Sequence, residues 1–544
     1  MTAAFILTGC APKMAGNINH PVTEPDVIAE KEKAEDAAAP HELQASPPQS
    51  KCMANRHMSM AGAAAMDYVV IQHNTEEYDH ISENEFKSVA ENPLSTFSID
   101  VDTASYSNVR RFIRYSQLPP LDSVRIEEMI NYFTYDYPQP AGPHPFSVVT
   151  EMSQCPWNRE NRLVHIGIQG KSLDYKNLKP ANLVFLVDSS GSMSDTNKLP
   201  LLKKSLGLLL NELSASDRIA IVAYAGSAGL ILPSTPATQK QKILAAIDRL
   251  QAGGSTAGGE GIELAYKVAK QNLLADGNNR VILCTDGDFN VGVSSTGDLV
   301  RIIEEKRKDD IYLTICGFGM GNYKDGRMEQ ISNAGNGNYF YIDSIREAEK
   351  VFVREMRANM FTIAKDVKIQ IEFNPVKVRA YRLVGYENRM LAKEDFNNDK
   401  KDAGELGAGH TVTALYEIVP VGSKQKINES GELKYQNTVV SDSAKNSGEI
   451  MTVKLRYKPP KSDTSILIVQ PLEYQTAALG KSSDNFRFSA AVAGFGMILR
   501  DSQFKKDLTF KDVIALAKKS KGKDSEGYRA EFIELVETCA LLKK

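Results

Sequence analysis

The sequence predicts a doubly wound α/β domain with a mostly parallel sheet, inserted in or flanked by an antiparallel β-sandwich and followed by C-terminal helices. Between residues 179 and 360, continuous apolar runs alternate with amphipathic helical patterns, as in a parallel sheet covered on both faces. On both sides of that region the hydrophobic period changes to two, which indicates half-exposed antiparallel strands. The 544 residues are enough for two or three domains of ordinary size.

Each predicted strand of the α/β domain is a short, nearly continuous apolar run, which suits burial on both faces. These strands are expected at residues 182–188, 218–224, 280–286, 311–317 and 338–342. Between these strands and after the last one, apolar residues recur three and four positions apart, which predicts amphipathic helices. These helices are expected at residues 197–214, 238–252, 259–275, 297–308 and 345–359.

The flanking regions alternate apolar and polar residues, the pattern of strands with one exposed face. Such strands are expected at residues 162–170, 367–373, 378–384, 410–418 and 451–457. We expect the later strands to pair with those near Val148 and Val164 in one β-sandwich that the α/β domain interrupts. Helical patterns are expected at residues 103–116, 123–133, 486–500 and 510–542.

These patterns divide the chain into six segments. We expect a lipoprotein signal remnant at residues 1–10, a disordered tether at 11–82, a flanking region at 83–178, the α/β domain at 179–360, the β-sandwich at 361–475 and a helical region at 476–544. Residues 21–50 are rich in Ala, Glu, Pro and Lys and have no apolar period, so they cannot build a core. If the whole predicted tether, residues 11–82, is a flexible coil, its root-mean-square end-to-end distance is roughly 45 Å.

The N-terminus contains a short apolar stretch that closes on Leu7-Thr8-Gly9-Cys10. This stretch resembles the lipobox of bacterial lipoproteins, and the resemblance implies a lipid on Cys10. It further implies a bacterial cell-envelope protein anchored at the outer membrane or the periplasmic face. The alternative is a chance cysteine near the start of a cytosolic protein.

Composition excludes some classes of function. The net charge is only −3, with Lys and Arg spread along the chain, so nucleic acid is not expected as a partner. The sequence has no apolar run of the roughly 18 residues that a membrane-spanning helix needs. Six cysteines are too few for a disulfide scaffold. Cys284 and Cys316 lie in apolar runs and are expected in the core, while the pairing of Cys52, Cys155 and Cys539 stays open.

Three polar motifs lie at the ends of predicted elements of the α/β domain. Asp188-Ser-Ser-Gly-Ser192 follows one strand, Gly253-Gly-Ser-Thr256 precedes a helix, and Asp286 ends another strand. In a doubly wound sheet such segments meet at the carboxyl edge of the strands, where ligands bind. The combination of D-x-S-x-S with a later Thr and Asp resembles the metal-ion-dependent adhesion site of von Willebrand factor type A domains, which have a Rossmann-like fold.

The resemblance implies that Ser190, Ser192 and Thr256 contact the metal, while Asp188 and Asp286 act through water or by holding the hydroxyls. Mg²⁺ prefers about six oxygen ligands and keeps several waters, a demand that these residues meet. Ca²⁺ and Mn²⁺ are alternatives, whereas zinc and copper are poor candidates because the set has no His or Cys. Two carboxylates only just balance a divalent ion, so the site favours an Asp or Glu of a partner protein as a further ligand. A simple Ser- and Gly-rich turn, with Asp188 capping a helix, is the alternative.

Outside the α/β domain a second resemblance appears. Residues 86–138, notably ENPLSTFSIDVDTASY at 91–106 and RIEEMINY at 125–132, resemble the region that precedes the A domain in YfbK-like bacterial proteins. The segment after Asp366 resembles the C-terminal domain of that family. The likeness covers most of the folded chain. It implies the domain architecture of that family but does not specify a biological function.

Three functions are compatible with these patterns. The first is a lipid-anchored envelope protein that binds a partner through the adhesion-site metal, and the second is an assembly or scaffold factor whose β-sandwich is the main interface. The third is a phosphatase-type enzyme, because Asp100-Val-Asp102-Thr resembles the start of the haloacid-dehalogenase signature, although Ala104 stands where that signature has Thr. No nucleotide-binding loop or nucleophile elbow occurs, so we do not expect an enzyme.

Overall fold

The computed structural model describes residues 74–174, 178–225, 227–254, 258–287, 296–428, 434–435, 439–475 and 477–543. The predicted lipidation residue Cys10, the signal remnant, Cys52 and the predicted metal ligand Thr256 lie outside these ranges. Four of the five predicted metal-site residues can therefore be placed, namely Asp188, Ser190, Ser192 and Asp286.

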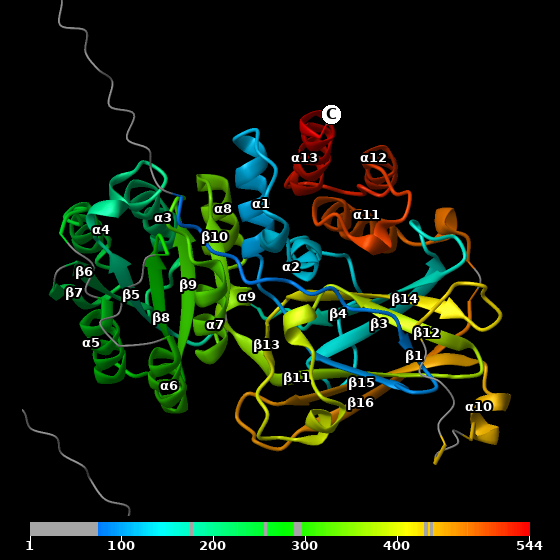
Figure 1. Ribbon diagram of the computed structural model, residues 1–544. Helices are drawn as coiled ribbons and strands as arrows, with labels where there is room; N and C mark the ends of the chain where they lie inside the picture. The colour runs from blue at the N-terminus through cyan, green and yellow to red at the C-terminus, as the bar shows by residue number, and fades with distance from the viewer. Residues whose placement is uncertain are drawn as a thin grey trace, which may run out of the picture. The chain divides into compact units, whose positions relative to one another are not determined.

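A six-stranded sheet forms the α/β domain, in the order β10-β9-β8-β5-β6-β7 (Figure 1). Its strands are β5 (Ala181–Asp188), β6 (Arg218–Ala225), β7 (Ser227–Pro236), β8 (Asn278–Thr285), β9 (Ile311–Phe318) and β10 (Tyr339–Ile342). Neighbouring strands are parallel except β7, which pairs antiparallel with β6 at the edge of the sheet. The predicted doubly wound, mostly parallel sheet is confirmed.

Helices cover both faces of this sheet, as Figure 1 shows. On one face pack α3 (Leu199–Glu212), α4 (Lys240–Asp248) and α8 (Ile345–Glu349), which a π-helical turn (Lys350–Arg354) and α9 (Met356–Met360) follow. On the other face pack α5 (Gly258–Gln271), α6 (Thr296–Lys306) and α7 (Asp325–Ala334). Two separate apolar cores result, one on each face, which explains why the strands are apolar on both sides.

Two further sheets form the predicted β-sandwich. The first has the order β1-β12-β14-β4-β3, and the second has the order β13-β11-β15-β16 with β2 also paired to β11. Their strands are β1 (Lys87–Ser88), β2 (Leu94–Ser98), β3 (Phe146–Gln154), β4 (Arg162–Gly170), β11 (Thr362–Phe373), β12 (Val378–Val384), β13 (Gly404–Gly407), β14 (Thr411–Pro420), β15 (Glu449–Lys458) and β16 (Ile466–Glu473). β4 pairs with β14, so strands on either side of the α/β domain join one sheet, as predicted. Side chains of both sheets share a single core.

The chain leaves the sandwich for the α/β domain and returns to it beside one turn. Gly409 N donates a hydrogen bond to Lys171 O on the outgoing segment, at 3.1 Å. Ala408 N donates to Phe361 O on the returning segment, at 2.8 Å. Both covalent connections of the α/β domain are therefore held by residues 408–409.

A fourth core lies among helices from both ends of the chain. It contains α1 (Ala104–Arg114), α2 (Ile126–Asn131), α11 (Asp484–Leu499), α12 (Phe510–Lys519) and α13 (Tyr528–Leu542). The helical pattern predicted over 510–542 is divided into α12 and α13 because Gly522 and Gly527 adopt positive φ, at 61° and 73°. Buried ion pairs connect α1 to its neighbours: Arg110 contacts Asp343, Glu347 and Glu531.

The segment just before residue 83 belongs to the folded unit, although the sequence placed the tether's end at 82. Thr75 N donates to Gly321 O at 2.7 Å, and Glu77 N donates to Tyr323 O at 2.9 Å. Glu76 also forms a buried ion pair with Arg111 of α1 at 2.7 Å. The described residues from Thr75 onward therefore belong to the folded unit, and backbone pairing, not an apolar period, holds this segment.

The described cysteines are all buried and unpaired, at Cys155, Cys284, Cys316 and Cys539. Cys284 and Cys316 lie on adjacent strands in the core, as predicted. Among the described helices, none combines the length and the apolar character that crossing a bilayer would require.

Candidate functional site

The first predicted motif begins at the carboxyl end of β5. Asp188 is the last residue of that strand and is fully buried. Its Oδ1 accepts a hydrogen bond from Ser190 N at 2.9 Å, and its Oδ2 accepts one from the Thr285 hydroxyl at 3.1 Å. Burial raises the pKa of Asp188, and the nearby charge of Asp286 adds to that effect. The carboxylate is thus fixed between two loops of the sheet edge.

The two serines of this motif point their hydroxyls at one another. Ser190 Oγ and Ser192 Oγ lie 3.0 Å apart, with Ser190 buried and Ser192 exposed. Two oxygens this close, one of them open to solvent, suit two neighbouring positions around a small cation. The pair therefore fits the ligand role that the sequence predicted.

The second motif lies directly against the first. Gly253 N donates to Ser189 O at 2.8 Å, and Gly191 N donates to Gly254 O at 3.2 Å. Gly254 has a φ of 88°, which favours glycine. Thr256 itself lies outside the described residues, but the chain two residues before it is joined to the Ser190 loop.

The third motif brings Asp286 to the same edge, directly after β8. Asp286 is fully buried, and its Oδ2 accepts a hydrogen bond from Lys198 Nζ at 2.9 Å. Thr285, the last residue of β8, connects it to the first motif through its bond to Asp188. The structure therefore brings together the four predicted residues that it describes.

The donor set fits a hard divalent cation. The predicted residues offer carboxylate and hydroxyl oxygens, the ligands that Mg²⁺, Ca²⁺ and Mn²⁺ prefer. The described surroundings also include Asn322, whose amide oxygen accepts from Lys198 Nζ at 3.4 Å. The motif pattern did not indicate Lys198 or Asn322, because their approach to Asp286 depends on loops distant from it in sequence.

A buried acidic cluster forms a second place where charge gathers. Asp100, Glu128 and Glu329 bring one oxygen each within 4.8 Å of the others. Arg125 forms ion pairs with Glu128 and Glu329, and Arg389 forms ion pairs with Asp100 and Glu329. Each acid of this cluster therefore already has a guanidinium partner, and the cluster serves as a contact between the α/β domain and the sandwich.

The geometry of this cluster argues against the phosphatase hypothesis. Asp100 and Asp102 are 3% and 2% exposed, and both pair with Arg389 at 3.1 Å. Burial, with the charge of Asp100 adding, raises the pKa of Asp102 to about 8. A phosphatase nucleophile must reach its substrate as an ionised carboxylate, whereas these side chains are enclosed and bound to an arginine.

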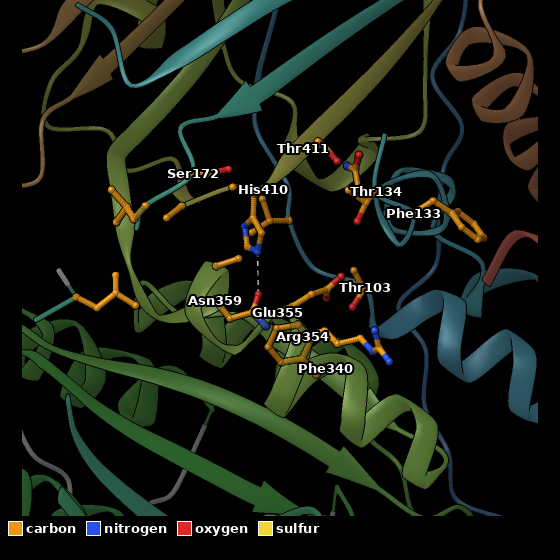
Figure 2. Close-up of a pocket in the computed structure, with 17 residues that line it drawn as sticks. Thr103, Phe133, Thr134, Ser172, Phe340, Arg354, Glu355, Asn359, His410 and Thr411 are labelled. Carbon is orange, nitrogen blue, oxygen red and sulfur yellow. Dashed lines mark hydrogen bonds between the residues drawn. The ribbon is translucent and has the colours of Figure 1, made fainter. Parts of the chain in front are cut away.

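A cavity of about 340 Å³ lies where the α/β domain joins the sandwich, and none of the four described metal-site residues lines it (Figure 2). His410 and Asn359 form a hydrogen bond across it at 2.8 Å, as the dashed line in Figure 2 marks. Thr103 Oγ1, Asn359 Nδ2 and His410 Nδ1 are buried without a protein partner. Burial, with the charge of Lys350 adding, lowers the pKa of His410 to about 4. The cavity thus offers neutral hydrogen-bonding groups that water can satisfy.

Three family models match the chain. The von Willebrand factor type A domain matches residues 182–354, and the model described as von Willebrand factor matches residues 72–165. The model described as uncharacterized protein YfbK, C-terminal, matches residues 358–542. The boundaries of the α/β domain and of the C-terminal match agree with the fold.

Individual proteins with similar sequences or structures are also known. The chain is 44% identical to the uncharacterized protein YfbK of Escherichia coli (strain K12) over 470 residues, covering 85% of this chain and 81% of that protein. It is 28% identical to the uncharacterized protein sll0103 of Synechocystis over 35% of this chain and 44% of that protein. The structure of a von Willebrand factor type A protein from Catenulispora acidiphila is similar with a TM-score of 0.40 at 17% identity, covering 73% of this chain and 91% of that one.

Proposed function

The chain belongs to the YfbK-like family of von Willebrand factor type A domain proteins, and we propose that it is a protein-binding module that recruits a carboxylate of its partner to a divalent metal ion. One observation carries the proposal. The buried carboxylates of Asp188 and Asp286 and the paired hydroxyls of Ser190 and Ser192 converge at one edge of the sheet. Mg²⁺ is the preferred ion, with Ca²⁺ and Mn²⁺ as alternatives.

Each residue has a distinct part in this proposal. Ser190 and Ser192 hold the ion through their hydroxyls, with Thr256 as a third hydroxyl that the sequence supplies. Asp188 orients Ser190 through the backbone hydrogen bond to its Oδ1. When bound, the divalent ion supplies a Lewis-acid position that an outside Asp or Glu can occupy. Specificity would then come from the loops around the exposed Ser192.

We also propose that this binding takes place at the bacterial cell envelope, with Cys10 as the lipidated residue. The support is the Leu7-Thr8-Gly9-Cys10 sequence alone. Metabolic labelling with a fatty-acid analogue, compared between the wild type and Cys10→Ser, tests it. Label that persists in Cys10→Ser would remove the anchor from the proposal.

Titration calorimetry tests the metal site. Mg²⁺, Ca²⁺ and Mn²⁺ are added to the full chain, to a Ser190→Ala, Ser192→Ala double variant and to Ser194→Ala, an exposed serine of the same loop, as the matched control. We expect saturable binding in the wild type and the control, and at least a tenfold weaker affinity in the double variant. Equal affinity in all three proteins would place any metal binding elsewhere, with the Asp100 cluster as the next site to test.

Capture of a partner then tests the role of the ion. If the proposal holds, a protein retained by the wild type is released by a chelator and is not retained by the double variant. The retained protein should also lose binding when the Asp or Glu that it presents is replaced by Asn or Gln. If the partner is retained in the presence of chelator and also by the double variant, it binds to a different surface of the protein.

The alternative of a scaffold with the sandwich as its main interface has one observation in its favour. β16 is an edge strand of the second sheet, and Ile466, Leu467 and Val469 on it are 38%, 50% and 52% exposed. An exposed apolar edge strand can pair with a strand of another chain. Val469→Lys should then abolish capture without any effect of chelator, whereas Leu541→Lys, at another exposed apolar position, should not.

A further inference from the structure

We infer that Lys198 is a built-in cation of the metal site, which weakens metal binding but leaves the loaded site positively charged and so selective for an anionic partner group. This inference rests on the proposed function. The adhesion-site pattern consists of acids and hydroxyls, so a lysine bound to one of its carboxylates is a departure that needs its own explanation. Lys198 Nζ lies 2.9 Å from Asp286 Oδ2.

The pairing is buried and close. Lys198 is 4% exposed and Asp286 is fully buried, so solvent screens their attraction little. The ammonium group also donates to Asn322 Oδ1 at 3.4 Å, on the loop that follows β9. A buried ammonium is costly unless it is paired, and Asp286 is the carboxylate that supplies the opposite charge.

The fold makes a place for this side chain. Lys198 precedes α3, where its N–H donates to Asp195 O and its carbonyl accepts from Leu202 N. Its aliphatic stem crosses the backbone of Gly319, where an added Cβ would lie 2.3 Å from Lys198 Cε. Gly319 also has a φ of 75°, which favours glycine. The loop that follows the carboxyl end of β9 therefore leaves room for the aliphatic stem of Lys198, whose ammonium group reaches Asp286.

Counting formal charges shows the consequence. Asp188 and Asp286 contribute two negative charges, and the serine hydroxyls contribute none. With a divalent ion and without Lys198 the site would be neutral, so an added carboxylate would make it negative. With Lys198 the loaded site carries one positive charge, and an added carboxylate makes it neutral. Lys198 thus opposes the ion and favours the partner's carboxylate.

The experiment separates these two effects with the full chain and three variants. Lys198→Met keeps the stem and removes the charge, Lys198→Arg keeps the charge, and Lys204→Met is the matched control on the exposed side of α3. The probes are Mn²⁺ alone and then acetate added to the Mn²⁺-saturated protein. Mn²⁺ affinity is read by calorimetry, and acetate is read by the fall in water-proton relaxation as it replaces metal-bound water.

We expect Lys198→Met to bind Mn²⁺ at least tenfold more tightly than the wild type and to bind acetate at least tenfold more weakly. Lys198→Arg and Lys204→Met should resemble the wild type in both. Lys198→Met also removes the buried ammonium group beside Asp286, so Mn²⁺ should raise the melting temperature of this variant more than that of the wild type. That third readout remains usable if the variant is only marginally folded without metal.

The outcomes also separate this inference from the proposed function. If the wild type binds Mn²⁺ but Lys198→Met binds it no more tightly, or binds acetate equally well, the inference is overturned and the proposed function stands. If Lys198→Met alone binds Mn²⁺, Lys198 occupies the place of the ion in the wild type, so no loaded site forms there and both the inference and the proposed function are overturned. If neither protein binds Mn²⁺, both are overturned.

Discussion

Replacing Arg389 by Met should lower the free energy of unfolding by about 3–5 kcal/mol at pH 7, because this residue is the shared partner of three buried carboxylates. Its guanidinium group lies 3.1 Å from Asp100, 3.1 Å from Asp102 and 3.2 Å from Glu329. The arginine side chain is 10% exposed and the three carboxylates are 2–9% exposed. Methionine fills much of the volume but leaves these acids without their common cation.

Two features of the structure set the size of the loss. Arg125 stays 3.6 Å from Glu329, so one carboxylate keeps a partner. Asp102 has a pKa of about 8 because of burial and the charge of Asp100, so it is largely protonated at pH 7 and loses less. Both features favour the lower end of the range. Burial raises the pKa of Glu329, so more of this carboxyl group is protonated at pH 5, and the loss of stability should be smaller there than at pH 7.

Urea unfolding provides the measurement. Trp157 is the single tryptophan of the chain and lies buried in the core of helices beside the sandwich, so its fluorescence reports on that part while circular dichroism reports on the whole. Arg301→Met removes an exposed arginine and should change stability by less than about 0.5 kcal/mol. A loss below about 1 kcal/mol for Arg389→Met, or an equal loss at pH 5 and pH 7, would refute the reasoning.

Two further predictions concern titration and thiols. A folded pKa raised by burial means that the native state holds a proton that the unfolded state loses, as for Asp102 at about 8 and Glu127 at about 7. Their contribution to stability is complete below about pH 4 and declines as the pH rises to 8, so Asp102→Asn should show a smaller decline in melting temperature between pH 5 and pH 8 than the wild type. A decline of equal size in both proteins would contradict the assignment. The second prediction concerns a variant in which Cys10 and Cys52 are replaced by Ser. In the folded variant no thiol should react quickly with a disulfide reagent, and after unfolding four thiols should react. A thiol that reacts quickly in the folded variant would contradict the burial of these cysteines. The four are Cys155, Cys284, Cys316 and Cys539.

The central strands were predictable because burial on both faces leaves a simple signal. The run predicted at 182–188 corresponds to β5, where every residue is buried. β7 was missed because it is an edge strand that contains Gly, Ser and Pro. α7 was missed because Asp325 and Glu329 are buried on it through ion pairs with Arg125, which interrupts the apolar period. A hydrophobic pattern cannot reveal a helix whose buried face is charged.

The convergence of the proposed metal-site residues was predictable because their motifs follow strands that end at one edge of a doubly wound sheet. Asp188, Ser190, Ser192 and Asp286 meet as the motif implied, since parallel strands end at one edge. Lys198 was expected only as part of a helix. Its role depends on Gly319, more than a hundred residues later, whose backbone leaves room for the lysine stem. Such a pairing has no local signal.

The turn at residues 408–409 bears on how firmly the α/β domain is oriented. Lys171 and Phe361, the two crossing points of the chain, both hydrogen-bond to this turn, so covalent attachment alone would act as a single pivot. Rotation about that pivot is opposed by contacts elsewhere, among them the buried pairs of Arg125 with Asp325 and of Arg389 with Glu329. These buried ion pairs therefore restrain the orientation of the α/β domain more than its two covalent connections do. Replacing Asp325 and Glu329 by their amides would weaken this restraint on the orientation of the domain, while its own cores and that of the sandwich stay intact.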